Sequence, residues 1–137
     1  MPADEGEKMR LFRQRKGQSL VETAIVLPLV LLLLMAIIDF GFLFNNYIVI
    51  SNASREAARK GSLGGTDAEI VQLVQNYTST LDSSRLSIDI YPAQSQRFHG
   101  SEIKVTVRYN NPMITPVIGS LLGNEIPLQG QVIMRVE

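Results

Sequence analysis

Two carboxylates bracket the most apolar stretch of the chain, and the chemistry they suggest is charge pairing. Glu22 lies five residues after Gly17, and Asp39 follows a run of fifteen residues, 24–38, without a polar side chain. An ionised acid at the centre of a lipid-embedded helix costs about 2.5–3.5 kcal/mol, and less near the edge. A position at the outer membrane–water boundary would explain Asp39. Glu22 requires either a cationic partner or a place near the inner interface.

The sequence offers no constellation typical of catalysis or metal binding. It has no cysteine and a single histidine, His99, in a polar stretch, so we expect no metal site. No nucleophile–base pair and no phosphate-binding loop can be identified, so we expect no cofactor and no small-molecule substrate. Net charge is zero and the basic residues beyond residue 17 are scattered, which does not favour nucleic-acid binding. We therefore expect a protein that is not an enzyme.

The apolar run predicts a helix that spans a membrane at about residues 22–44. A hydrocarbon core requires ~20 helical residues, and a segment that is apolar on every face is typical of a lipid-embedded helix. A secretory signal peptide is the competing interpretation, but its apolar region covers only ~7–15 residues and ends in a small-residue cleavage site. Here the run ends in Asp39-Phe40-Gly41. Pro28, in the first half of the run, predicts a kink or a locally melted stretch.

The charges around the run predict its orientation. Residues 1–17 carry five basic and three acidic side chains, and the far side has no basic residue before Arg55. Positively charged residues stay on the cytoplasmic side. We therefore expect a single-pass protein of the inner (cytoplasmic) membrane, with a cytoplasmic N-terminus and an extracytoplasmic C-terminal domain.

Beyond the membrane, the pattern predicts an α+β fold. The long helix is expected to reach about residue 61, where Gly61 is a plausible stop. Thr66 and Glu69 have the spacing of a capping box, and apolar residues at helical spacing follow to residue 81. Three segments then alternate apolar and polar residues, which predicts a three-stranded antiparallel sheet. These segments are residues 86–90, 103–109 and 132–136.

One apolar segment of this outer domain fits neither pattern. Residues 112–122 contain two prolines and are too short to span a membrane. The segment could cover the core or form an exposed contact surface for a partner or for lipid head groups. Of the two, we expect a place in the core.

Several motifs together give the chain a family resemblance. Gly17 to Glu22, GQSLVE after a basic leader, resembles the processing site of type IV prepilins. With the segments VLP, IIDFG and NASREAAR, it is similar to the TadE-like family of minor pilins or pseudopilins in the tight-adherence (Flp) pilus system. The matching segments are residues 17–22, 26–28, 37–41 and 52–59.

The resemblance implies a processed structural protein. A prepilin peptidase would cut after Gly17 and remove the leader, residues 1–17, so that Gln18 becomes the N-terminus of a helix over residues 18–61. Glu22 would then pair with the new amine of a neighbouring subunit, where acid and ammonium relieve each other's desolvation cost. We expect Glu22, Pro28 and Asp39 to take part in subunit packing.

The implied partners are the lipid bilayer, the prepilin peptidase and other pilin-like subunits, and the protein could be incorporated into a pilus. Residues 62–137 would form its outward-facing α+β domain. The alternative is a single-pass anchor that is never cleaved and whose extracytoplasmic domain binds a ligand or partner.

Overall fold

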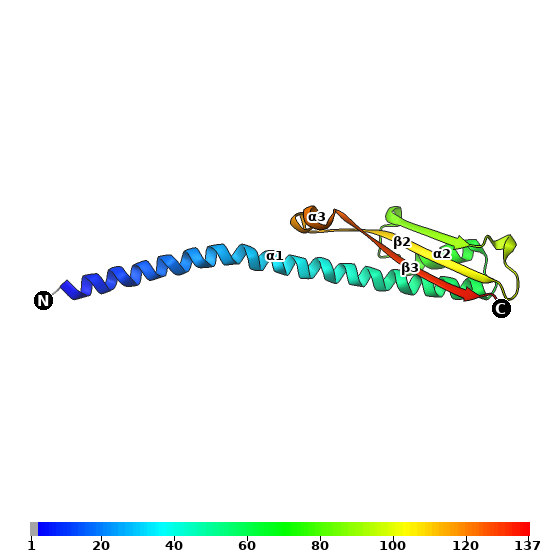
Figure 1. Ribbon diagram of the computed structural model, residues 1–137, viewed down its shortest axis with the longest axis horizontal. Coiled ribbons are helices and arrows are strands. Elements are labelled where there is room, and N and C mark those ends of the chain that lie inside the picture. Colours follow the sequence, from blue (N-terminus) through cyan, green and yellow to red (C-terminus); the bar gives the residue numbers. More distant parts are fainter. Residues whose placement is uncertain (1–2) are drawn as a thin grey trace. The chain divides into compact units, whose positions relative to one another are not determined.

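The computed structural model describes residues 3–137, with side chains described from Gly17 onward. The basic side chains of the expected leader before Gly17 therefore lie outside the described residues. The chain divides into two units, residues 1–38 and 39–137. Helix α1 (Ala3–Ser62) belongs to both, and the second unit adds two helices and three strands (Figure 1). The expected α+β class, a long apolar helix followed by a short helix and a three-stranded antiparallel sheet, is confirmed.

The first unit consists of α1 alone, and its apolar side chains are uncovered. From Gly17 to Ser62 the helix is long and apolar enough to cross a membrane, with a mean hydropathy of 2.7 over its most apolar 18 residues, none of which is buried. Pro28 lies inside the helix. An uncovered helix that is apolar on all faces is stable in lipid, because there its side chains need no protein cover.

Helix α2 (Asp67–Tyr77) begins at the predicted capping box. The Thr66 hydroxyl accepts a hydrogen bond from the Glu69 N–H at 3.2 Å, and the Glu69 carboxylate accepts one from the Thr66 N–H at 3.1 Å. The helix ends four residues before its predicted end at residue 81. The side chain of the buried Thr78 donates to the Val74 carbonyl at 2.8 Å, and Leu81 reaches the edge of the core from the following turn.

The sheet has the order β1-β2-β3, and both neighbouring pairs are antiparallel. Its central strand β2 (Glu102–Pro112) pairs with β1 (Leu86–Tyr91) on one side and β3 (Glu125–Arg135) on the other. Short 3₁₀ turns, η1 (Ser83–Arg85) and η2 (Gln94–Gln96), flank β1. The register places the alternating apolar residues of all three strands on one face of the sheet, as alternation of period two requires.

That apolar face is covered by α2 and by the C-terminal part of α1. Ala53, Ala57 and Ala58 of α1 are fully buried there, beside the strand residues. Small side chains let the helix approach the sheet closely. At Gly130 on β3, an added Cβ would lie 2.8 Å from the Ser54 hydroxyl and 2.9 Å from the Ile50 carbonyl oxygen. The core comprises Ile50, Ala53, Ala57, Ala58, Ile70, Val74, Ile103, Val105, Val107, Tyr109, Leu128 and Val136.

The connection between β2 and β3 contains a third helix, α3 (Pro116–Leu122), which the sequence analysis did not predict. Its Ile118 is buried, as is Thr115 just before it. Ile114, Val117, Leu121 and Leu122 are exposed. Ile118 is not among the residues of the core cluster that covers the sheet, so the expectation that this segment belongs to the core is not confirmed.

Candidate functional site

Gly17, Gln18 and Glu22, the expected processing residues, lie on one exposed stretch of α1. All three are exposed, and the helix continues through them. Among residues 17–137, the Glu22 carboxylate makes no ion pair and no hydrogen bond. A shallow depression on the same helix is lined by Glu22 with Thr23, Val26, Leu27 and Val30. The Glu22 carboxylate is thus a negatively charged group at the edge of an apolar surface, where it could pair with a cation.

Asp39 has a different environment from Glu22. Its side chain is 2% exposed. One carboxylate oxygen accepts a hydrogen bond from the Ile114 N–H and the other from the Thr115 N–H, each at 3.1 Å. The acid is thus paired within its own chain, with partners that the sequence did not reveal.

A second polar contact, between α1 and the end of β2, lies near Asp39. Asn46 of α1 donates through its side-chain amide to the Asn111 side-chain oxygen at 2.6 Å, and Asn111 in turn donates to the Pro112 carbonyl at 3.2 Å. Asn111 is buried. Together with Asp39, these amides attach the end of β2 to α1 through polar groups, which sequence patterns did not reveal.

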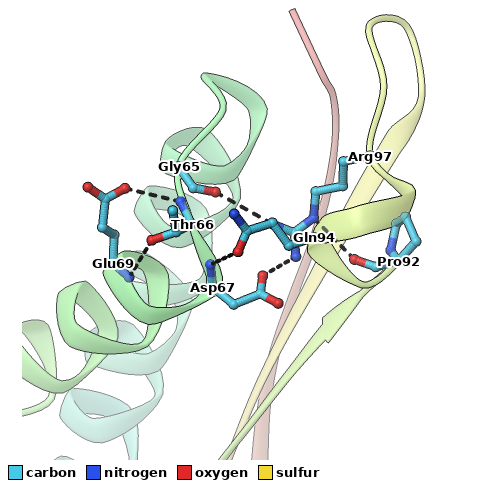
Figure 2. Close-up of polar contacts among 7 residues, drawn as sticks. All are labelled: Gly65, Thr66, Asp67, Glu69, Pro92, Gln94 and Arg97. Atoms are coloured by element: carbon cyan, nitrogen blue, oxygen red, sulfur yellow. Dashed lines mark hydrogen bonds and ion pairs between the residues drawn. The ribbon is translucent and has the colours of Figure 1, made fainter.

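At the other end of the domain, Arg97 holds two loops together (Figure 2). Its side chain is 6% exposed, and its guanidinium forms an ion pair with Asp67 and donates to the Pro92 carbonyl at 3.1 Å. Gln94 accepts a hydrogen bond from the Asp67 N–H at 3.2 Å. The N-terminus of α2 is therefore bound to the segment between β1 and β2. This is a structural contact, since nothing in it resembles a binding or catalytic centre.

We expect Arg97→Ala to lower the free energy of unfolding by about 1.5–3 kcal/mol, the usual size for hydrogen bonds of a charged group that is largely covered. Arg108→Ala is the matched control. Its ion pair with Asp89 is about half exposed on both sides and should contribute about 1 kcal/mol or less. Denaturation of the full chain in detergent micelles, followed by tyrosine near-ultraviolet circular dichroism, measures both. Equal losses would contradict this assignment.

The described part of the chain contains no candidate site for a metal ion. No group of three or more His, Asp or Glu side chains there could hold a metal ion. His99 is exposed in the connection between β1 and β2. The residues with predicted roles are Gly17, Gln18 and Glu22 on the apolar part of α1, and Asp39, the first residue of the second unit.

A comparison with known families gives a match that covers these residues. Residues 17–59 match the family described as TadE-like protein. The match begins at Gly17 and includes Glu22, Pro28 and Asp39. The TadE-like resemblance inferred from the motifs is confirmed for this segment of the chain. Comparisons with curated proteins and with solved structures gave no significant match.

Proposed function

We propose that this chain is a minor pilin-like (pseudopilin) component of a tight-adherence pilus assembly or secretion apparatus. The observation that carries the proposal is the TadE-like segment 17–59, which coincides with a helix apolar enough to cross a membrane. The family suggests a structural role associated with the Tad pilus, and no enzymatic activity is proposed.

The proposed topology follows from the charges. The N-terminus lies in the cytoplasm, α1 crosses the inner membrane, and the sheet domain lies outside. The exposed apolar side chains of α1 would contact lipid before assembly and the helices of other subunits afterwards. In lipid, helices associate by close packing and by polar contacts, and the Glu22 carboxylate supplies such a contact.

Processing by a prepilin peptidase after Gly17 is part of the proposal. A residue without a side chain allows the peptidase close access to the bond, and Gly17 is exposed. Cleavage would create a free ammonium on Gln18, which is the partner that Glu22 requires.

The experiment is to co-produce the full chain with a prepilin peptidase and measure the intact mass. We expect the wild-type chain to begin at Gln18 and Gly17→Leu to keep its leader. Gly41→Leu is the matched control, because a Cβ added at either glycine meets no atom within 4 Å. It should be processed normally.

Normal processing of Gly17→Leu would contradict the cleavage site. A wild-type chain that keeps Met1 in the presence of an active peptidase would instead support the alternative, an uncleaved single-pass anchor with an extracytoplasmic binding domain.

A further inference from the structure

We propose that the connection between β2 and β3 is a second membrane contact, which inserts into the outer lipid interface beside the exit of α1. This segment, residues 113–124, is called the α3 tip below. The proposal rests on the proposed membrane anchoring by α1. The surface that the tip contacts is the boundary between the head groups and the acyl chains of the bilayer.

The composition of the α3 tip favours lipid over water. Between Arg108 and Glu125 the chain has no charged residue. Four large apolar side chains of the tip are nevertheless exposed: Ile114 62%, Val117 49%, Leu121 77% and Leu122 58%. An exposed cluster of this kind on a small domain indicates a contact surface.

The contact with Asp39 determines the depth of the tip. Asp39 comes directly after the apolar run 24–38, and its carboxylate binds the N–H groups of Ile114 and Thr115. Asp39 lies in the last quarter of the expected span, about residues 22–44, so it is close to the outer edge of the hydrocarbon whether a span of ~20 residues starts near Leu20 or near Glu22. The exposed Phe40, on the next position of α1, extends the apolar surface slightly further. The α3 tip therefore lies at the level where α1 leaves the hydrocarbon.

The same contact solves two problems that arise at this depth. A carboxylate at the edge of the hydrocarbon is costly without partners, and non-helical backbone there needs every N–H satisfied. Asp39 accepts from two N–H groups of the non-helical stretch, and the Met113 N–H donates to the Asn124 carbonyl at 3.0 Å. Residues 116–122 of the tip are helical, and the Gly123 N–H donates to the Gly119 carbonyl at 2.9 Å. Interfacial amphipathic helices bury their apolar face about 5–10 Å into the boundary between head groups and acyl chains.

The chain contains no tryptophan, so a single introduced tryptophan reports its own surroundings. We would place Leu121→Trp in the full chain, reconstitute it in phosphatidylcholine–phosphatidylglycerol vesicles, and use lipids brominated either near the head group or near the chain end. Leu121 is 77% exposed, so the indole can be accommodated without disturbing the core.

Two control variants keep the outcomes distinct. Leu31→Trp lies in the middle of the apolar run and reports the anchoring itself. Phe98→Trp replaces a side chain that is 71% exposed. Phe98 precedes the start of β2, whereas the α3 tip follows the end of β2. An eleven-residue strand, ~36 Å long at ~3.3 Å per residue, lies between the two positions in the chain.

We expect Leu121→Trp to emit at shorter wavelength than Phe98→Trp and to lose most of its emission with lipids brominated near the head group. Leu31→Trp should be quenched most by lipids brominated near the chain end, and Phe98→Trp by neither. Quenching of Leu31→Trp without quenching of Leu121→Trp would overturn the inference and leave the anchoring intact. A blue-shifted but unquenched Leu121→Trp would also overturn it, since a protein partner would then cover the tip. An unquenched Leu31→Trp would remove the membrane anchoring and this inference with it.

Discussion

Asp39→Ala should release the α3 tip from α1. The substitution leaves the N–H groups of Ile114 and Thr115 without their acceptors, and a buried donor without a partner, as at Thr115, costs about 1–3 kcal/mol. Because neighbouring Pro112 and Pro116 carry no N–H, the stretch between them has few ways to form a substitute network. We therefore expect the tip to open locally while the sheet remains folded.

Hydrogen exchange of the full chain in detergent micelles measures this effect. Amides of residues 113–122 should exchange at least about tenfold faster, the change that about 1.4 kcal/mol produces. Amides of α2 should keep their protection, because this helix, with its buried residues Ile70 and Val74, makes no hydrogen bond to Asp39. Asp89→Ala, which removes an exposed acid of the sheet, is the control and should leave the tip unchanged. Unchanged exchange at Ile114 and Thr115 in Asp39→Ala would contradict the assigned role.

Local patterns in the sequence predicted much of the fold correctly. The capping box of Thr66 and Glu69 involves atoms three residues apart, so its spacing alone identifies it. The alternation of residues 103–109 places one set of side chains on one face by geometry, and these residues are indeed buried. The helix end predicted at Gly61 is within one residue of the observed end at Ser62.

Strand β3 shows why a pattern can be too short. The alternation of residues 132–136 predicted only its end, since Pro127 and Gly130 interrupt the apolar pattern before that. The observed strand begins at Glu125. Proline is tolerated there because β3 pairs with β2 alone and is an edge strand. Gly130 is required by the approach of α1, a constraint set by a helix some 75 residues earlier in the sequence.

The remaining surprises are contacts between distant parts of the chain. Arg55 and Arg59 are exposed, but the small residues between them, Ala57 and Ala58, form part of the core. A fragment that begins at residue 62 would lack the part of α1 that contributes these core residues. Likewise, Asp39 and Ile114 are 75 positions apart, and nothing local marks either as the partner of the other. A single sequence shows that an acid needs a partner but cannot say which one.

Glu22→Gln should insert into the membrane as well as the wild-type chain and fail to join pilus assemblies. Insertion becomes easier because a charge is removed from the apolar run. Assembly becomes harder because the ammonium of Gln18 on a neighbouring subunit loses its counter-ion. An unpaired buried charge costs about 3–5 kcal/mol, which corresponds to a loss of roughly two to four orders of magnitude in association.

Co-purification with the other pilus subunits measures assembly, and resistance to alkaline extraction measures insertion. Glu56→Gln is the matched control, because it neutralises an acid on the same helix beyond the apolar run and should assemble normally. Wild-type assembly of Glu22→Gln would instead mean that the carboxylate reaches the inner interface and has no partner.

A double-mutant cycle identifies that partner. If Glu22 pairs with the amine that cleavage creates, the uncleaved Gly17→Leu chain has no such amine. Removing the acid from that chain should then cost little more, so the losses of Gly17→Leu and Glu22→Gln should be strongly non-additive. Residual association is quantified for all four chains by crosslinking in vesicles at a range of protein densities. Additive losses would show that Glu22 acts on something other than the new N-terminus, and would leave cleavage and charge pairing as two separate requirements of assembly.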